Sequence, residues 1–208
     1  MILNDDAKGI IMKSILFLIV TFAVGLSSAA LPVQYEQCLP ERSKTLLPGE
    51  LQEMAKLVRV IVCQNYANAF TADQTLDLLK SKNISMGISL AQTGFLYENL
   101  LAFAKVNPYV LFVDSNRLFP EQLEGLARAG VEIVVISGKT AFPMEGLRAF
   151  AKKESFTYHV NSNILKENLK DLASLKVKLV IEAVNSSISK EALAEIAQAN
   201  ADLITVLP

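Results

Sequence analysis

Few residues of this chain have side chains suited to catalysis or metal binding. Among its 208 residues there is one histidine, His159, and there are two cysteines, Cys38 and Cys63. The stretch Ser137-Gly138-Lys139-Thr140 resembles the end of a phosphate-binding loop, but it lacks the glycine that begins that motif. A lone histidine without a Cys/His cluster leaves little with which to hold zinc. We therefore expect no catalytic residue, no cofactor and no metal site.

The first thirty residues have the composition of an export signal. Lys8 and Lys13 precede the apolar run 15–26, and small residues follow it. This order is typical of a secretory signal peptide, with cleavage after Ala29 or Ala30. The apolar run is shorter than the roughly 20 residues that a membrane span needs. We expect residues 1–30 to be removed, whether translation starts at Met1 or at Met12, and the mature chain to be secreted or periplasmic, without a stable membrane span.

Export changes the interpretation of the two cysteines. Disulfides persist in oxidising compartments, and an even pair of cysteines suits one. Cys63 ends an apolar, strand-like run, whereas Cys38 lies in an irregular lead-in over residues 31–47. A Cys38–Cys63 bridge would stabilise the fold by about 3 kcal/mol in the chain-entropy model. Two buried free thiols are the structural alternative, and a catalytic thiol lacks any evident basic partner.

The elements that position these residues come from a repeated unit. The helical pattern Leu-x-x-(Leu/Phe/Ile/Met)-Ala recurs along the mature chain and makes one apolar stripe on each helix. Its leading leucines are 25, 24, 23, 24, 22 and 24 residues apart. They are Leu51, Leu76, Leu100, Leu123, Leu147, Leu169 and Leu193. In the last five copies a glutamate stands two places before the leucine, which suits the positive end of a helix.

Short apolar runs rich in β-branched residues alternate with these helices and predict strands. The predicted strands are 58–63, 84–90, 109–113, 132–136, 156–160, 178–184 and 202–207. Strands joined through helices run parallel, so the pattern predicts an α/β protein. We expect residues 48–208 to form a single domain of about seven units of 22–25 residues each.

The turns after the strands carry a more specific pattern. The segments LFVDSNRL, YHVNSNIL and VIVCQNYA each carry an asparagine, namely Asn116, Asn163 and Asn65, after alternating aliphatic or aromatic residues. The chain resembles the leucine-rich repeat family, in particular its helix-bearing, cysteine-containing subtype, over residues 45–208. Lys139 departs from the pattern by occupying the asparagine position of the fourth unit. The resemblance implies a parallel β-α repeat solenoid, an open arc that binds proteins through its sheet face.

The apolar character of the strands leaves a second architecture open. In an open arc, one residue of each strand would face the concave side of the sheet. For the first six strands we expect these residues to be Ile61, Ser89, Phe112, Val135, His159 and Val180, of which four are apolar. Strands that are apolar throughout are typical of a sheet buried on both faces. The alternatives are a hydrophobic binding face on the arc and a compact parallel α/β fold in which both faces are covered.

We expect an exported repeat protein that acts as a recognition module for an unknown protein partner. Its candidate partner-binding residues are Ser89, Phe112, Asp114, Val135, Ser137, His159, Asn161, Val180 and Glu182. A small exported enzyme or ligand-binding domain, with its site at the carboxyl ends of the strands, is one alternative. A module that associates with itself through its C-terminal edge is another. A formal net charge of −1 argues against nucleic-acid binding.

Overall fold

The computed structural model describes residues 33–39 and 46–207. All of them belong to one compact unit, residues 31–208. The predicted signal peptide, residues 1–30, and its cleavage position lie outside the described residues. Within the described part of the chain, no helix has both the length and the apolar character that a membrane span requires.

Helices and strands alternate along the described chain. The strands are β1 (Val60–Gln64), β2 (Ile84–Ser89), β3 (Val110–Val113), β4 (Glu132–Ile136), β5 (Thr157–Val160), β6 (Lys178–Glu182) and β7 (Ile204–Leu207). The helices are α2 (Pro48–Leu57), α3 (Ala72–Leu79), α4 (Tyr97–Val106), α5 (Pro120–Arg128), α6 (Met144–Ala151), α7 (Lys166–Ser174), α8 (Ala183–Ser186) and α9 (Lys190–Asn200). Two 3₁₀ turns, η1 (Tyr35–Cys38) and η3 (Ala201–Leu203), complete the list.

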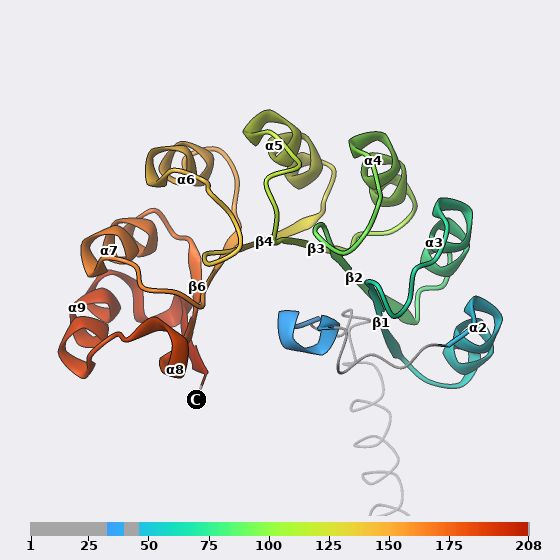
Figure 1. Cartoon of the computed structure of the whole chain (residues 1–208), viewed down its shortest axis with the longest axis horizontal. Coiled ribbons are helices and arrows are strands. Elements are labelled where there is room, and N and C mark those ends of the chain that lie inside the picture. Colours follow the sequence, from blue (N-terminus) through green and yellow to red (C-terminus); the bar gives the residue numbers. More distant parts are fainter. Residues whose placement is uncertain (1–32, 40–45, 208) are drawn as a thin grey trace, which may run out of the picture. The chain divides into compact units, whose positions relative to one another are not determined.

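The seven strands form a single parallel sheet in the order in which they occur along the chain, β1 to β7. Each predicted strand is present, with ends that differ by at most two residues. The expectation of an α/β fold with a repeat-like arrangement is therefore confirmed. Figure 1 shows helices α2 to α7 and α9 along one face of the sheet, whereas η1 lies against the other. We call the face that carries η1 the second face.

The helices begin where the sequence provides suitable first-turn residues. The Thr71 side chain accepts a hydrogen bond from the backbone N–H of Gln74, and the Ser189 side chain caps α9 in the same way. Pro120 stands in the first turn of α5, where its missing N–H costs no helical hydrogen bond. These local signals fix where α3, α5 and α9 begin.

The repeated leucine stripe packs against the sheet and builds the main core. In α4, Leu100 and Phe103 are buried, and in α7 Leu169 and Leu172 are fully enclosed. Alternate strand residues such as Leu111 contribute from the sheet side. Burial of these side chains is the main stabilising contribution, because each one removes a large apolar area from water.

A second, smaller core lies on the second face and explains why the strands are apolar on both sides. There the lead-in, described here over residues 33–39, places Tyr35 and Cys38 against Phe112 and Val134. The rings of Tyr35 and Phe112 have centroids 5.3 Å apart. The apolar residues of the first strands are therefore covered by the chain's own N-terminal segment.

The predicted disulfide is confirmed and fastens the lead-in to the sheet. Cys38 is bonded to Cys63 at the end of β1, with their Cα atoms 5.0 Å apart. The Asn65 side-chain amide also donates to the Cys38 carbonyl, at 2.8 Å. Gly87 leaves the space that this segment needs: a Cβ there would lie 2.7 Å from Val33 and 2.8 Å from the Cys38 sulfur.

The structure corrects the predicted row of inward-facing residues at one position. Phe112 pairs in register with Val134, and Val113 pairs with Val135. Because side chains alternate between the faces of a sheet, Val134 shares the second face with Phe112. Val135 points the other way and is fully buried in the main core beneath the helices.

Candidate functional site

A pocket opens on the second face between the lead-in and the later strands. Its volume is about 180 Å³. Val134, Val180 and Leu207 supply apolar lining, whereas Glu132 and Lys178 are exposed charged residues at the beginnings of β4 and β6. The lead-in forms one wall of this pocket, so the site depends on the segment that the disulfide anchors.

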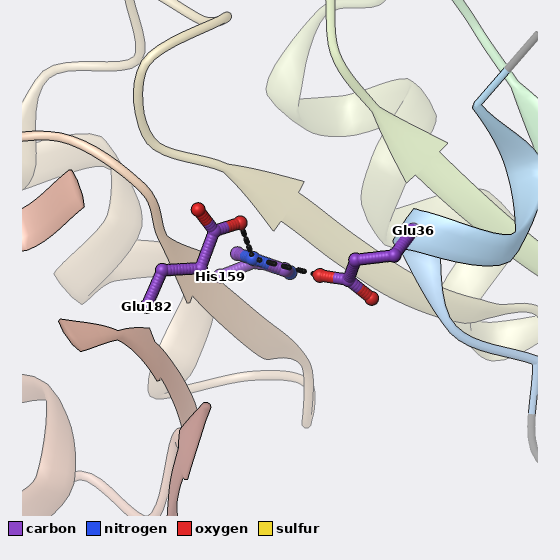
Figure 2. Close-up of side chains that lie close together, drawn as sticks. All are labelled: Glu36, His159 and Glu182. Carbon is purple, nitrogen blue, oxygen red and sulfur yellow. Dashed lines mark hydrogen bonds and ion pairs between the residues drawn. The ribbon is translucent and has the colours of Figure 1, made fainter. Parts of the chain in front are cut away.

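The single histidine is the most enclosed titratable group of this pocket. His159 lies in β5, and only 3% of its side chain is exposed. Its Nε2 atom is 2.6 Å from Oε1 of Glu182 and 3.3 Å from Oε1 of Glu36. Figure 2 shows the two carboxylates approaching this nitrogen from β6 and from η1. Both neighbours are carboxylate oxygens, so Nε2 is the donor in the tautomer that carries its hydrogen on this atom.

Only one of the two carboxylates receives that hydrogen. The Glu182 oxygen takes the hydrogen bond, and the Glu36 Oε1 atom is buried without a hydrogen-bond partner. The side chain of Asn185 donates to the second oxygen of Glu182, at 2.5 Å. Glu182 is thus held from both sides, whereas Glu36 has an unsatisfied oxygen facing the imidazole.

A second polar cluster lies at the carboxyl ends of β2 and β3. Asp114 is buried, and its carboxylate accepts hydrogen bonds from the Ser89 hydroxyl at 2.5 Å and from the backbone N–H of Ala91 at 2.7 Å. The Tyr35 hydroxyl also donates to it, at 3.4 Å. Burial, and then the nearby Asp114 carboxylate, raises the pKa of the Tyr35 phenol, which keeps that donor protonated.

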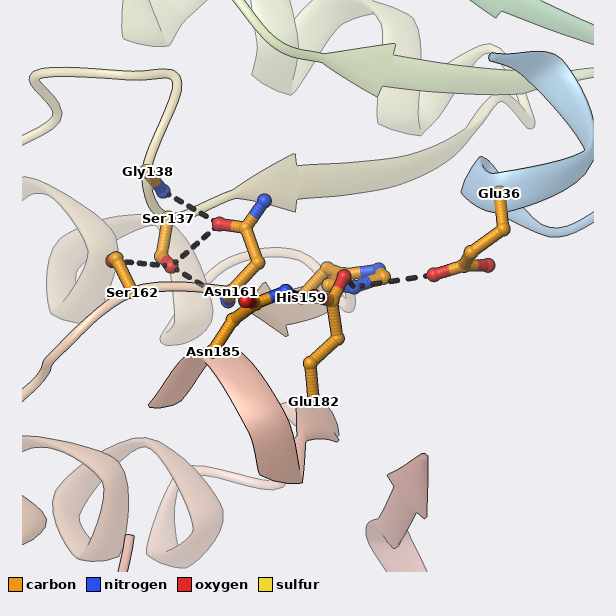
Figure 3. A network of polar contacts seen from close by, with 8 residues as sticks. All are labelled: Glu36, Ser137, Gly138, His159, Asn161, Ser162, Glu182 and Asn185. Atoms are coloured by element: carbon orange, nitrogen blue, oxygen red, sulfur yellow. Dashed lines mark hydrogen bonds and ion pairs between the residues drawn. The ribbon is translucent and has the colours of Figure 1, made fainter. Parts of the chain in front are cut away.

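Further polar residues join the turns that follow β4 and β5. The Asn161 side chain accepts a hydrogen bond from the backbone N–H of Gly138, at 2.9 Å. The Ser137 hydroxyl lies 2.8 Å from that of Ser162 and accepts from the Asn161 backbone N–H. Figure 3 shows these bonds beside the group of His159 and Glu182. Among the described residues, the side chains of Ser137 and Asn161 bond to other residues of the turns, so they tie neighbouring units together.

The structure therefore separates the predicted partner-binding residues into several groups. His159 and Glu182 are brought together, with Val180 in the adjoining pocket. Ser89 and Asp114 form the buried cluster with Tyr35. Phe112 lines the pocket but is almost fully buried against Tyr35, Val135 lies in the main core, and Ser137 and Asn161 lie in the turns.

Sequence reasoning missed the contribution of Glu36. It lies in an irregular lead-in, far from His159 along the chain, and no motif spacing connects the two. The one available signal was Cys38, two residues later, because a bridge from Cys38 to the end of a strand must bring Glu36 to the sheet. The resulting group of Glu36, His159 and Glu182 offers three ligand atoms within 4.8 Å of one another.

The fold and the pocket together define an α/β protein with one parallel sheet, helices along one face and a recess on the other. Comparison with protein-family models finds no matching family, and comparison with curated proteins finds no matching relative.

Proposed function

We propose that this chain is an exported repeat protein of leucine-rich-repeat type that recognises a protein partner through the second face of its sheet. The proposal rests on one observation: part of that face is covered by the lead-in and part of it is accessible. The lead-in covers its apolar part over the early strands, and the recess lies beside it over β4 to β7. A covered half next to an accessible half gives a partner one defined place to bind.

The order of the strands supports the repeat interpretation. Strands pair with their neighbours in sequence, and helices α2 to α7 and α9 lie on one side. A doubly wound sheet places helices on both faces. A singly wound stack of short β-α units, in contrast, is the arrangement of a solenoid whose sheet face binds partners.

The lining of the recess indicates which surface a partner would present. Val180 and Leu207 offer apolar contact, and the exposed Lys178 and Glu132 bear opposite charges near it. An apolar side chain that enters the recess, with polar groups around it, matches the usual anatomy of a protein interface. The disulfide supports the extracellular or periplasmic setting in which we place this interaction.

The proposal is tested in two steps with the purified, disulfide-bonded chain. Proteins captured from the native envelope or secreted fraction are identified, and each is then purified and titrated against defined variants. Val180→Glu places a charge in the recess, and we expect it to weaken partner binding by about tenfold or more. Val106→Glu is the matched control, since Val106 is exposed on α4.

A partner that loses affinity with Val180→Glu and keeps it with Val106→Glu supports recognition through the second face. Equal binding by both variants, or loss with Val106→Glu alone, would contradict it. Failure to capture any protein that binds the purified chain directly would also count against a recognition function.

A further inference from the structure

The group of Glu36, His159 and Glu182 contains more hydrogen-bond acceptors than donors. One N–H faces two carboxylate oxygens, so one oxygen is left without a donor. Among the described residues, neither carboxylate forms an ion pair with a lysine or an arginine. Burying an acceptor that has no partner is unfavourable, and two carboxylates that lie close together repel each other.

We propose that these three side chains bind a divalent transition-metal ion, with Zn²⁺ as the reference ion. Imidazole nitrogen and carboxylate oxygen are both ordinary zinc ligands. An ion between them would interact with the unsatisfied Glu36 oxygen and offset the repulsion of the carboxylates at the same time. His159 would bind as the tautomer that carries its hydrogen on Nδ1, so Nε2 is free to coordinate. The site adjoins the recess proposed for partner recognition, but zinc binding does not depend on that function.

The two distances to His159 Nε2 suit this assignment with small side-chain adjustments, and all three ligand atoms lie within 4.8 Å of one another. Ligand atoms about 2.1 Å from a tetrahedral zinc ion lie about 3.4 Å from each other. The distance from His159 Nε2 to Glu36 Oε1 is already 3.3 Å. The shorter distance to Glu182, 2.6 Å, must lengthen by less than 1 Å. Both glutamates can adjust, since 26% and 19% of their side chains are exposed.

Surrounding contacts hold the three ligands in place. The Tyr35 ring lies edge-on to the His159 ring, with centroids 5.8 Å apart. The Asn185 amide orients the Glu182 carboxylate, as outer groups commonly do in metal sites. Glu36 and His159 both line the recess, so a position on the metal opposite the protein ligands would face it.

The test is a zinc titration of the untagged, disulfide-bonded chain after removal of metal with a chelator. We expect calorimetry to show one Zn²⁺ bound per chain. Glu36→Gln and Glu182→Gln should each weaken binding by about tenfold or more, because an amide oxygen is a poorer ligand than a carboxylate. Glu132→Gln is the matched control, since this glutamate lines the same recess but lies outside the ligand group.

Zinc should also raise the melting temperature of the wild-type chain and of Glu132→Gln, and have little effect on Glu36→Gln. Glu36 is the safest ligand to change, since it lies in a short turn and the glutamine keeps its size. Absence of zinc binding up to about 1 mM would overturn the proposal. So would equal affinities of Glu36→Gln and Glu132→Gln, which would leave the group a purely structural contact.

Discussion

At the scale of single residues, Gly87 decides whether the lead-in can lie flat on the sheet. A methyl group at this position would meet Val33, Cys38 and Phe112 at 2.7 to 2.9 Å, closer than real Cβ contacts allow. Gly87 lies inside β2 and not in a turn, so no local pattern in the sequence shows why a glycine is needed there. Its role follows from a contact between segments far apart in the chain.

We expect Gly87→Ala to destabilise the fold by about 1–3 kcal/mol, because the lead-in must move away from β2. Urea unfolding followed by circular dichroism measures the loss. Gly94→Ala is the control, since a Cβ at Gly94 would meet no atom within 4 Å. Equal stability of the two variants would show that the lead-in does not depend on close approach at Gly87.

Buried tyrosines make the fold sensitive to alkaline pH. Burial raises the pKa of Tyr158 from 10.0 to about 12, and it also raises the pKa of Tyr109. In the unfolded chain such phenols ionise near pH 10. The folded state therefore keeps a proton that the unfolded state releases, so its stability is complete below pH 10 and falls as the pH rises from 10 to 12.

The variant Tyr158→Phe isolates one of these groups. It keeps the ring and removes the phenol, so we expect a shallower loss of unfolding free energy between pH 10 and 12 than in the wild type. The difference should approach about 2–3 kcal/mol at the upper end of that range. Urea unfolding at a series of pH values measures it. Parallel curves for the two proteins would show that Tyr158 is not protected by burial.

At the scale of elements, the disulfide holds η1 against the sheet. The Cys38–Cys63 bridge joins residues 25 apart, so in the chain-entropy model its removal should cost about 3 kcal/mol. We expect the double variant Cys38→Ala/Cys63→Ala to lose about this stability in urea unfolding. The loss of the bridge should also make the lead-in the first site of limited proteolysis.

Two results would contradict that role of the bridge. One is unchanged stability of the double variant, which would mean that the packing of Tyr35 on Phe112 suffices. The other is that proteolysis begins in a helix of the main core rather than within residues 33–39.

The elements were largely predictable from the sequence, because their signals are local. The spacing of Leu100 and Phe103, and its copies, identifies the buried side of each helix. The lead-in was not predictable, since its packing on Phe112 is a tertiary contact without a periodic signal. Val135 was assigned to the wrong face because its strand also lacks a periodic signal. The run EIVVI has no polar residue after Glu132 to fix the alternation of its side chains. A shift of one residue in such a strand exchanges its two faces.

The candidate site was predictable only in part. His159 and Glu182 stand out as polar residues in or at the end of apolar strands, and the register of β5 and β6 brings their elements together. The contact between Glu36 and His159 could not be inferred, because it depends on how far the lead-in extends across the sheet from the disulfide. The expectation of no metal site rested on the numbers of histidines and cysteines, whereas the proposed zinc site also uses carboxylates from separate elements.

At the scale of the whole described unit, contacts run chiefly between neighbouring repeats. Each strand bonds to its neighbours in sequence, and helices such as α3 and α4, or α7 and α9, pack side by side. In repeat proteins whose units contact only their neighbours, stability is close to a sum over units and their interfaces. The last unit, with β7 at the edge of the sheet, has a neighbour on one side only.

We therefore expect Ile196→Ala, in the buried position of α9, to increase hydrogen exchange in α9 and β7 while β2 to β4 keep their protection. Exchange followed by mass spectrometry resolves these segments. Leu126→Ala in α5 is the comparison, since this buried leucine lies in a central unit. Uniform loss of protection with Ile196→Ala would show that the unit unfolds as one cooperative block.

The lead-in also spans a fixed number of strands. It is fixed to β1 through Cys38, and two residues earlier Glu36 meets His159 in β5. Inserting one more repeat between these strands would move His159 by a strand spacing, about 4.8 Å, and separate the two side chains. Repeats added after β6 would leave that distance unchanged. The contact between Glu36 and His159 therefore requires the present number of units between β1 and β5, and it places no such requirement on the units after β6.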